Sequence, residues 1–239
     1  LSGVITIPFL EQDLRLDVAL EHLGALGPRP TASAVSSGRI AFARRAQALA
    51  RTLDAGPEAF APRRSAPLAS PPKHLTWLLP SFSHPWGGVH TLLRFADRWS
   101  RDFGAQNLFV IYDDPHVSAR EMAARAAVVF PDLPGRFEVL PSADAVARLP
   151  KTDVVVSTAW PSAYAALRHP RAGFHAYFVQ DDESQFHAAG TQSALADNTY
   201  RFGFFGIFNG QGLHDALTRA PPMRGTWFEP SVDHALFHP

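Results

Sequence analysis

Two adjacent glycines, Gly87 and Gly88, stand in the loop formed by residues 83–90, between an apolar run and a helical pattern. Glycine lets the backbone approach a ligand closely, and the N–H groups and dipole at the start of a helix favour a phosphate or carboxylate. The loop is not a dinucleotide fingerprint, because Thr91 and Leu92 follow where a third glycine is needed, and it lacks the Gly-Lys-Ser/Thr of a Walker loop. Anion binding and tight strand-to-helix packing are therefore the two interpretations of this pair.

A second candidate is the string Gln180, Asp181, Asp182 and Glu183, which places three acids directly after a predicted strand. Carboxylates at such a position bind sugar hydroxyls, or act as a general base if burial raises the pKa. The alternative is a helix N-cap, with Asp181 or Asp182 as the capping residue, and the two roles are compatible. The motif is not Asp-x-Asp and has no adjacent histidine at ligand spacing, so it does not indicate a metal site.

Other polar residues carry weaker signals. Asp113, followed by Asp114 and Pro115, is a candidate for a sugar or ribose hydroxyl, although Asp-Asp-Pro is also an ordinary turn. Ser157 and Thr158 lack the Gly-x-Ser-x-Gly elbow, so a hydrolase triad is not supported. The chain has 11 histidines, but none stands at a zinc-protease spacing.

The elements that must position these residues alternate between strands and helices from residue 73 onward. Predicted strands cover residues 74–79, 108–112, 137–140, 153–157, 174–180, 204–209 and 226–229. Predicted helices cover residues 89–101, 117–129, 143–149, 160–168, 183–200 and 211–219. This alternation predicts an α/β fold, a Rossmann-like parallel sheet of about seven strands with helices on both faces. Ligands then bind at the carboxyl ends of the strands, where both candidate motifs stand.

The preceding region has a different character. Residues 11–26 and 36–53 have helical periodicity, and residues 56–73 are rich in Pro, Ala and Ser. We therefore predict a helical extension and Pro-rich linker over residues 1–72, the Rossmann-like domain over 73–230, and the start of an interdomain linker over 231–239. The arginines of the extension indicate either a solvated helix face or contact with anionic lipid or an acidic acceptor: Arg39, Arg44, Arg45 and Arg51.

Composition excludes several classes of protein. The formal net charge is zero, from 22 basic and 22 acidic residues, which gives no electrostatic basis for nucleic-acid binding. There are no cysteines, so disulfides, thiol catalysis and cysteine-based metal sites are excluded. No apolar run is long enough to span a membrane, and the start lacks the layout of a signal peptide. We expect a cytoplasmic location, with the inner face of the cell membrane as the alternative.

Three stretches together resemble a known family. They are the run from Trp86 to His90, the string from Tyr177 to Glu183, and the closing run from Val232 and Asp233 to Pro239. They resemble the N-terminal half of GT-B glycosyltransferases of family 4, and the similarity covers residues 73–239. Within that family, the Tyr-Phe-Val-Gln-Asp string is similar to bacterial rhamnosyltransferases of rhamnan, S-layer glycan and O-antigen assembly.

The resemblance implies an acceptor-side domain that faces a nucleotide-binding C-terminal domain across a cleft. It implies that Gly87 and Gly88 lie beside the donor diphosphate and that Asp181 and Glu183 are catalytic. It also places at the acceptor or sugar side a set of residues: Trp86, His90, Gln180 and Asp182. Asp113 joins this set from its position after the second predicted strand. Such enzymes need no bound metal and no cofactor, because the nucleoside-diphosphate sugar is itself the donor substrate.

We therefore expect the full-length protein to be a metal-independent bacterial glycosyltransferase of polysaccharide biosynthesis. It would transfer a sugar, with rhamnose as the candidate, from a nucleoside diphosphate to a glycan acceptor. Its partners would be the nucleotide sugar, the glycan and a C-terminal domain missing from this chain, without which we expect no activity. The alternatives are a non-catalytic GT-B-like domain that binds glycan or protein, and an unrelated Rossmann-like nucleotide-binding module.

Overall fold

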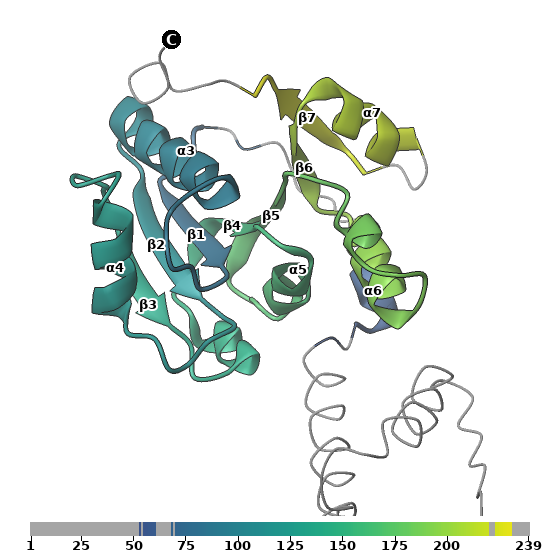
Figure 1. Cartoon of the computed structure of the whole chain (residues 1–239), viewed down its shortest axis with the longest axis horizontal. Helices are drawn as coiled ribbons and strands as arrows, with labels where there is room; N and C mark the ends of the chain where they lie inside the picture. The colour runs from purple at the N-terminus through teal and green to yellow at the C-terminus, as the bar shows by residue number, and fades with distance from the viewer. Residues whose placement is uncertain (1–52, 54, 61–67, 69, 220–222, 231–239) are drawn as a thin grey trace, which may run out of the picture. The chain divides into compact units, whose positions relative to one another are not determined.

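The computed structural model contains one sheet of seven parallel strands in the order β3-β2-β1-β4-β5-β6-β7 (Figure 1). The strands are β1 (His74–Leu79), β2 (Gln106–Ile111), β3 (Arg136–Val139), β4 (Thr152–Ser157), β5 (Ala172–Val179), β6 (Phe205–Asn209) and β7 (Gly225–Phe228). The predicted Rossmann-like sheet is confirmed. The chain moves outward from β1 through β2 and β3 and then returns to the other side of β1 with β4. The carboxyl ends of β1 and β4 therefore form the switch point at which such sheets bind ligands.

The structure describes residues 53, 55–60, 68, 70–219 and 223–230. All of them belong to one unit, Leu49–Pro239. The predicted helical extension, with its arginines, and the predicted linker over 231–239 lie outside the described residues, and the boundary at residue 72 stays a prediction. Within the described part of the chain, no helix is long and apolar enough to cross a membrane.

Helices and 3-10 turns connect the strands. These connections are α3 (Gly88–Phe103), α4 (Ala119–Ala127), η2 (Ala143–Arg148), α5 (Trp160–Leu167), η3 (Glu183–Phe186), α6 (Thr191–Thr199) and α7 (Gln211–Arg219), and η1 (Pro57–Phe60) precedes β1. The prediction of one helix over residues 183–200 is wrong, because the chain forms η3, leaves the helix at an extended His187 and restarts at α6. Ala188, Ala189 and Gly190 occupy the break, and Gly190 is the extended residue before α6.

Each face of the sheet carries its own apolar core. One core joins Leu78 and Val155 of the sheet to Tyr164 of α5 and Leu217 of α7. The other joins alternate positions of the same strands, such as Trp77, to α3 and α4 (Figure 1). The strands are buried on both faces, as expected for a parallel sheet covered by helices. Each fully buried large apolar side chain contributes roughly 1.5–3 kcal/mol.

A buried amide fixes α3 to the sheet. The Oδ1 atom of Asn107 accepts a hydrogen bond from Trp77 Nε1 at 2.9 Å. Its Nδ2 atom donates to the Ser100 hydroxyl at 2.8 Å and to the Ala96 carbonyl at 3.1 Å, both on α3. Because α3 begins at Gly88, these bonds also set the position of the glycine loop.

A carboxylate fixes the start of β1. Both backbone N–H groups of Lys73 and His74 donate to Asp153 Oδ2 of β4, at 2.8 and 2.9 Å. The Lys73 N–H is the largest influence that holds the pKa of Asp153 below its usual range. This contact, the Asp153 latch, fixes the point at which the chain enters the sheet.

Candidate functional site

The glycine loop forms a tight turn at the carboxyl end of β1. The Val89 N–H donates to the Trp86 carbonyl at 3.2 Å, which closes a four-residue turn with Gly87 and Gly88 at its centre. Gly87 has φ 54° and ψ −122°, close to the mirror image of a type II turn, which favours glycine. The N–H groups of Gly87 and Gly88 have no hydrogen-bond partner among the described residues. The first turn of α3 contains no acid, so this helix start presents free donors and a positive dipole end.

The two sequence motifs meet at this point. A Cβ atom placed on Gly88 would lie 2.7 Å from Gln180 Nε2 and 2.9 Å from Gln180 Oε1, at the end of β5. The glycine at position 88 therefore makes room for the Gln180 amide. The sequence placed both motifs at one edge of the sheet, and the structure brings these two residues into contact.

Asp181 and Asp182 have different environments. The Asp182 carboxylate caps η3, since it accepts from the Ser184 N–H at 3.2 Å, the Ser184 hydroxyl at 2.6 Å and Gln185 Nε2 at 2.8 Å. Asp181 is exposed, and its Oδ1 accepts from the Asp182 N–H at 2.8 Å. Its Oδ2 has no partner among the described residues. Asp181 is thus the acid of the string with an oxygen open to a ligand.

Glu183 lies inward. Its Oε2 accepts from the Trp160 N–H at 2.8 Å, at the start of α5, and its Oε1 accepts from the Tyr177 hydroxyl at 3.0 Å. Its own N–H donates to the Tyr200 hydroxyl at 2.9 Å. Burial raises the pKa of Glu183, the Trp160 and Tyr177 hydrogen bonds oppose the rise, and the charges of Asp181 and Asp182 add to it. The predicted catalytic role of Glu183 stays a prediction, on a carboxylate whose two oxygens are already engaged.

The remaining predicted residues surround the same edge. Trp86 is 70% exposed and stacks on His84, with ring centroids 4.6 Å apart. The Asp113 Oδ1 atom accepts from the Ser81 N–H at 2.7 Å, so this side chain joins the loop after β2 to the loop after β1. The His90 ring packs against Phe130, with centroids 5.1 Å apart.

Several residues of this edge were not identified from the sequence. Phe186 is 63% exposed at the end of η3. Tyr177 and Tyr200 contact Glu183, and burial raises the pKa of both phenols. The spacing of Glu183 and Tyr200 on what looked like one helix gave no signal of this contact, because the break between η3 and α6 creates it.

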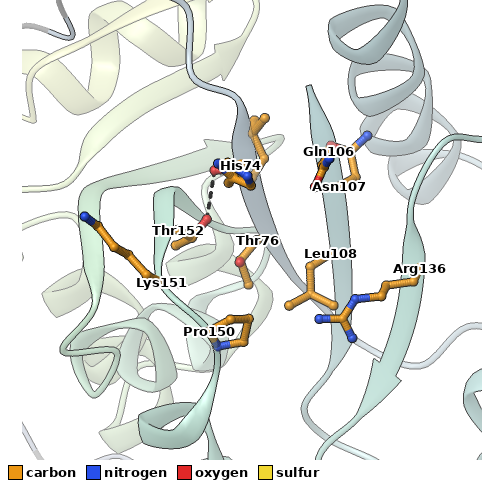
Figure 2. A pocket seen from close by; sticks show the side chains of 10 residues that line it. His74, Thr76, Gln106, Asn107, Leu108, Arg136, Pro150, Lys151 and Thr152 are labelled. Carbon is orange, nitrogen blue, oxygen red and sulfur yellow. Dashed lines mark hydrogen bonds between the residues drawn. The ribbon is translucent and has the colours of Figure 1, made fainter. Parts of the chain in front are cut away.

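A hollow of about 220 Å³ lies at the opposite edge of the sheet (Figure 2). It is lined by residues at the beginnings of β1 to β4, including Thr76, Arg136 and Lys151. Figure 2 shows the Thr152 hydroxyl bonded to the His74 carbonyl at its rim. It contains none of the predicted site residues. Across the described ranges, no group of three His, Asp or Glu side chains is placed to hold a metal ion.

Comparison with known proteins gives three findings. A family model described as "WsaF, N-terminal domain" matches residues 75–209, which include both motifs. The O-antigen biosynthesis protein RfbC of Myxococcus xanthus is 51% identical over 164 residues, which are 69% of this chain and 13% of RfbC. HepE of Anabaena, solved in complex with UDP, aligns at 18% identity with a TM-score of 0.49, over 68% of this chain and 45% of that chain.

Proposed function

Because the chain belongs to the family of WsaF N-terminal domains, a family of GT-B glycosyltransferases, we propose that it forms the acceptor-side half of a sugar transferase. The whole enzyme would move a sugar from a nucleoside diphosphate to a hydroxyl of a glycan of the O-antigen type. The chain spans 13% of the length of RfbC, its relative in O-antigen biosynthesis. A second, nucleotide-binding domain of the same polypeptide is therefore part of the proposal.

The observation that carries the proposal is the pair of free N–H groups on Gly87 and Gly88, at the switch point of the sheet. An anion placed there receives two backbone hydrogen bonds and the field of the α3 dipole. In the proposed reaction, the bond between the anomeric carbon and the diphosphate breaks and the acceptor oxygen bonds to that carbon, while the proton of the acceptor hydroxyl passes to a base, for which Asp181 is the candidate. Preorganised donors at the departing diphosphate stabilise the negative charge that develops on it.

We assign the acceptor side to the open oxygen of Asp181 and to the exposed ring of Trp86. Asp181 Oδ2 is free to accept a hydrogen bond from a sugar hydroxyl. The Trp86 ring, held from one side by His84, offers a rigid apolar surface with a polar edge for a pyranose ring. The Gln180 amide lies beside Gly88 and therefore adjoins the proposed diphosphate position.

The second candidate function is glycan binding without transfer. The exposure of Trp86 and Phe186 supports it, since both are large apolar side chains open to solvent at the edge where the ligand is proposed. Both functions predict glycan binding at Trp86. Only the transferase predicts an effect of Asp181 on turnover.

The deciding experiment is a transfer assay on the full-length protein with a panel of nucleotide sugars, with dTDP-rhamnose first. Asp181→Asn keeps the oxygen that accepts from the Asp182 N–H but removes the charge. We expect it to lower kcat about 10- to 100-fold, the effect of losing one charge-assisted hydrogen bond in the transition state. Asp132→Asn, an exposed residue before β3, is the matched control and should leave turnover unchanged. Glycan binding with no transfer from any donor would favour the second function.

We further propose that the protein acts in the cytoplasm, because the proposed donor is a nucleotide sugar. Peripheral contact of the arginine-bearing extension with the inner face of the membrane stays part of this proposal. Cell fractionation of the full-length protein, with and without residues 1–52, tests both statements.

A further inference from the structure

The start of α5, at the carboxyl end of β4, is the other helix terminus at the switch point. Its first N–H groups are already bonded within the chain. The Thr158 and Ala159 N–H groups donate to the Ser162 hydroxyl, at 2.9 and 3.1 Å, and the Trp160 N–H donates to Glu183 Oε2 at 2.8 Å. Pro161 has no N–H. The two helix starts beside the switch point therefore differ, since α3 has free donors and α5 has none to offer a ligand.

The N–H group of Trp160 at the start of α5 donates to a carboxylate from a distant part of the sequence. Glu183 stands 23 residues after Trp160, beyond β5, and its carboxylate lies where a bound anion would lie. Its other oxygen is held by the Tyr177 hydroxyl at 3.0 Å, and its backbone N–H by the Tyr200 hydroxyl at 2.9 Å. The Tyr177 and Tyr200 rings stack, with centroids 6.0 Å apart and an interplanar angle of 20°. These contacts connect β5, η3, the end of α6 and the start of α5.

We propose that Glu183 is the resident anion of the α5 terminus: it closes this terminus to phosphate and fixes the β5–η3 loop that carries Gln180 and Asp181. In this role Glu183 is a positioning residue, acting through the loop rather than on the reacting atoms. Of the two helix starts at the switch point, α3 is thereby the one left open to an anion. The inference goes beyond the proposed transfer function and does not depend on it, because it concerns an anion site within this chain.

The geometry makes a specific chemical prediction about removal of the side chain. Glu183→Ala leaves the Trp160 N–H and the Tyr177 hydroxyl without an acceptor and opens a space of carboxylate size. Formate has the shape and charge of the missing group, so it should bind there. Glu183→Gln keeps one carbonyl oxygen for Trp160 and an amide toward Tyr177, whose hydroxyl is able to accept instead, so it should leave no vacant anion site.

The experiment measures thermal unfolding of this chain, with 200 mM formate, formamide or chloride added in parallel. We expect Glu183→Ala to lower Tm by about 5 °C or more. Formate should return at least half of that loss, the neutral formamide should return clearly less than formate, and the chloride control should return none. Wild type and Glu183→Gln should shift by less than about 1 °C in formate. Glu121→Ala, which removes an exposed acid from the first turn of α4, is the control for general salt effects.

A second readout reports on the terminus itself. In wild type the Trp160 amide proton is bonded to a carboxylate, so its NMR signal should lie downfield, should move upfield in Glu183→Ala, and should return with formate. If Glu183→Ala does not fold in buffer, the same comparison is made on refolding yield with each additive. The inference is overturned if formamide matches formate, if every variant gains equally from formate, or if formate restores neither folding nor the Trp160 signal. Loss of sugar transfer in the full-length assay would leave it unaffected.

Discussion

At the scale of single residues, Gly87 and Gly88 are adjacent, but glycine serves a different purpose at each position. Gly87 has a positive φ of 54°, and a Cβ atom there would meet nothing within 4 Å. Glycine is therefore needed at position 87 for its backbone conformation and not for space. Gly88 has ordinary dihedral angles, and its Cβ would meet the Gln180 amide at 2.7 Å. Glycine is therefore needed at position 88 for space, because a side chain there would meet the flexible end of Gln180.

Alanine at the two positions should separate these requirements. Gly87→Ala should lower the free energy of unfolding by about 1–3 kcal/mol, the cost of a side chain in a sparsely populated backbone region. Gly88→Ala should change it by less than about 0.5 kcal/mol, because Gln180 is able to swing away. Urea denaturation of both variants measures the difference. A larger loss for Gly88→Ala than for Gly87→Ala would contradict the turn assignment.

Glu183 gives the chain a pH dependence of definite sign. Its pKa is raised above the ordinary value of 4.5 in the folded state, chiefly by burial. At pH values between 4.5 and the raised pKa of the folded state, the folded state binds more protons than the unfolded state. The free energy of unfolding therefore falls as pH rises through this window. The contribution is fully present below pH 4.5 and is lost above the folded pKa. Asp153 has the opposite sign, since its pKa is lowered and its contribution is lost as pH falls.

The variant Glu183→Gln, which does not titrate, isolates this contribution. We expect the free energy of unfolding of wild type, relative to Glu183→Gln, to increase as pH is lowered from 7 to 4. Urea denaturation at each pH measures it. Other titrating groups, Asp153 included, are common to both proteins and cancel in the difference. A difference that is constant, or that grows with rising pH, would show that Glu183 is not held in a buried site.

At the scale of elements, the strands were predictable and the helix breaks were not. Every strand was located from the sequence, because most are short apolar runs between turn signals, such as the three valines of β4. The break between η3 and α6 was missed, since Ala188 and Ala189 are good helix formers and only Gly190 disfavours continuation. The hydrogen bond from the Glu183 N–H to the Tyr200 hydroxyl, which joins the start of η3 to the end of α6, is a tertiary contact that the local sequence does not indicate.

The candidate site, too, was predicted only in part from the sequence. Sequence reasoning located the glycine loop and the acid string, because both follow clear strands and parallel strands end at a common edge. It did not distinguish the roles of the three acids. Asp181 is exposed, Asp182 caps η3 and Glu183 bonds to α5. Those roles depend on which way each side chain turns in a 3-10 turn, and adjacent acids in a sequence do not specify this.

The attachment of α3 to the sheet provides an element-scale test. Asn107→Ala removes the acceptor of the buried Trp77 N–H and the donor to Ser100 and Ala96. An unpaired buried donor costs about 1–3 kcal/mol, so we expect a loss of at least about 2 kcal/mol, measured by urea denaturation. Asn198→Ala, a half-buried asparagine on α6, is the control. A loss at Asn107 no greater than at Asn198 would show that the amide does not fix α3.

At the scale of the whole molecule, the two most exposed aromatic side chains of the described Phe, Tyr and Trp residues, Trp86 and Phe186, follow β1 and β5 at the carboxyl edge, where glycan binding is proposed. Trp86→Ala should weaken binding of a cognate glycan about 5- to 10-fold, from loss of one stacking surface, without lowering Tm, because the ring is 70% exposed. Saturation-transfer NMR on this chain measures the binding. Trp227→Ala, on the edge strand β7, is the control and should leave binding unchanged. Equal weakening by both variants would place the glycan elsewhere.

The Asp153 latch has a consequence for synthesis on the ribosome. β1 is an interior strand of the sheet, yet one of its two neighbours, β4, and the Asp153 carboxylate that fixes its start follow some 80 residues later. At translation rates of about 5–20 residues per second, that delay is about 4–16 seconds. During it, the edge of β1 that will receive β4 is not yet paired with that strand. A chaperone that shields this open edge is therefore most useful in that interval, before Asp153 has left the exit tunnel.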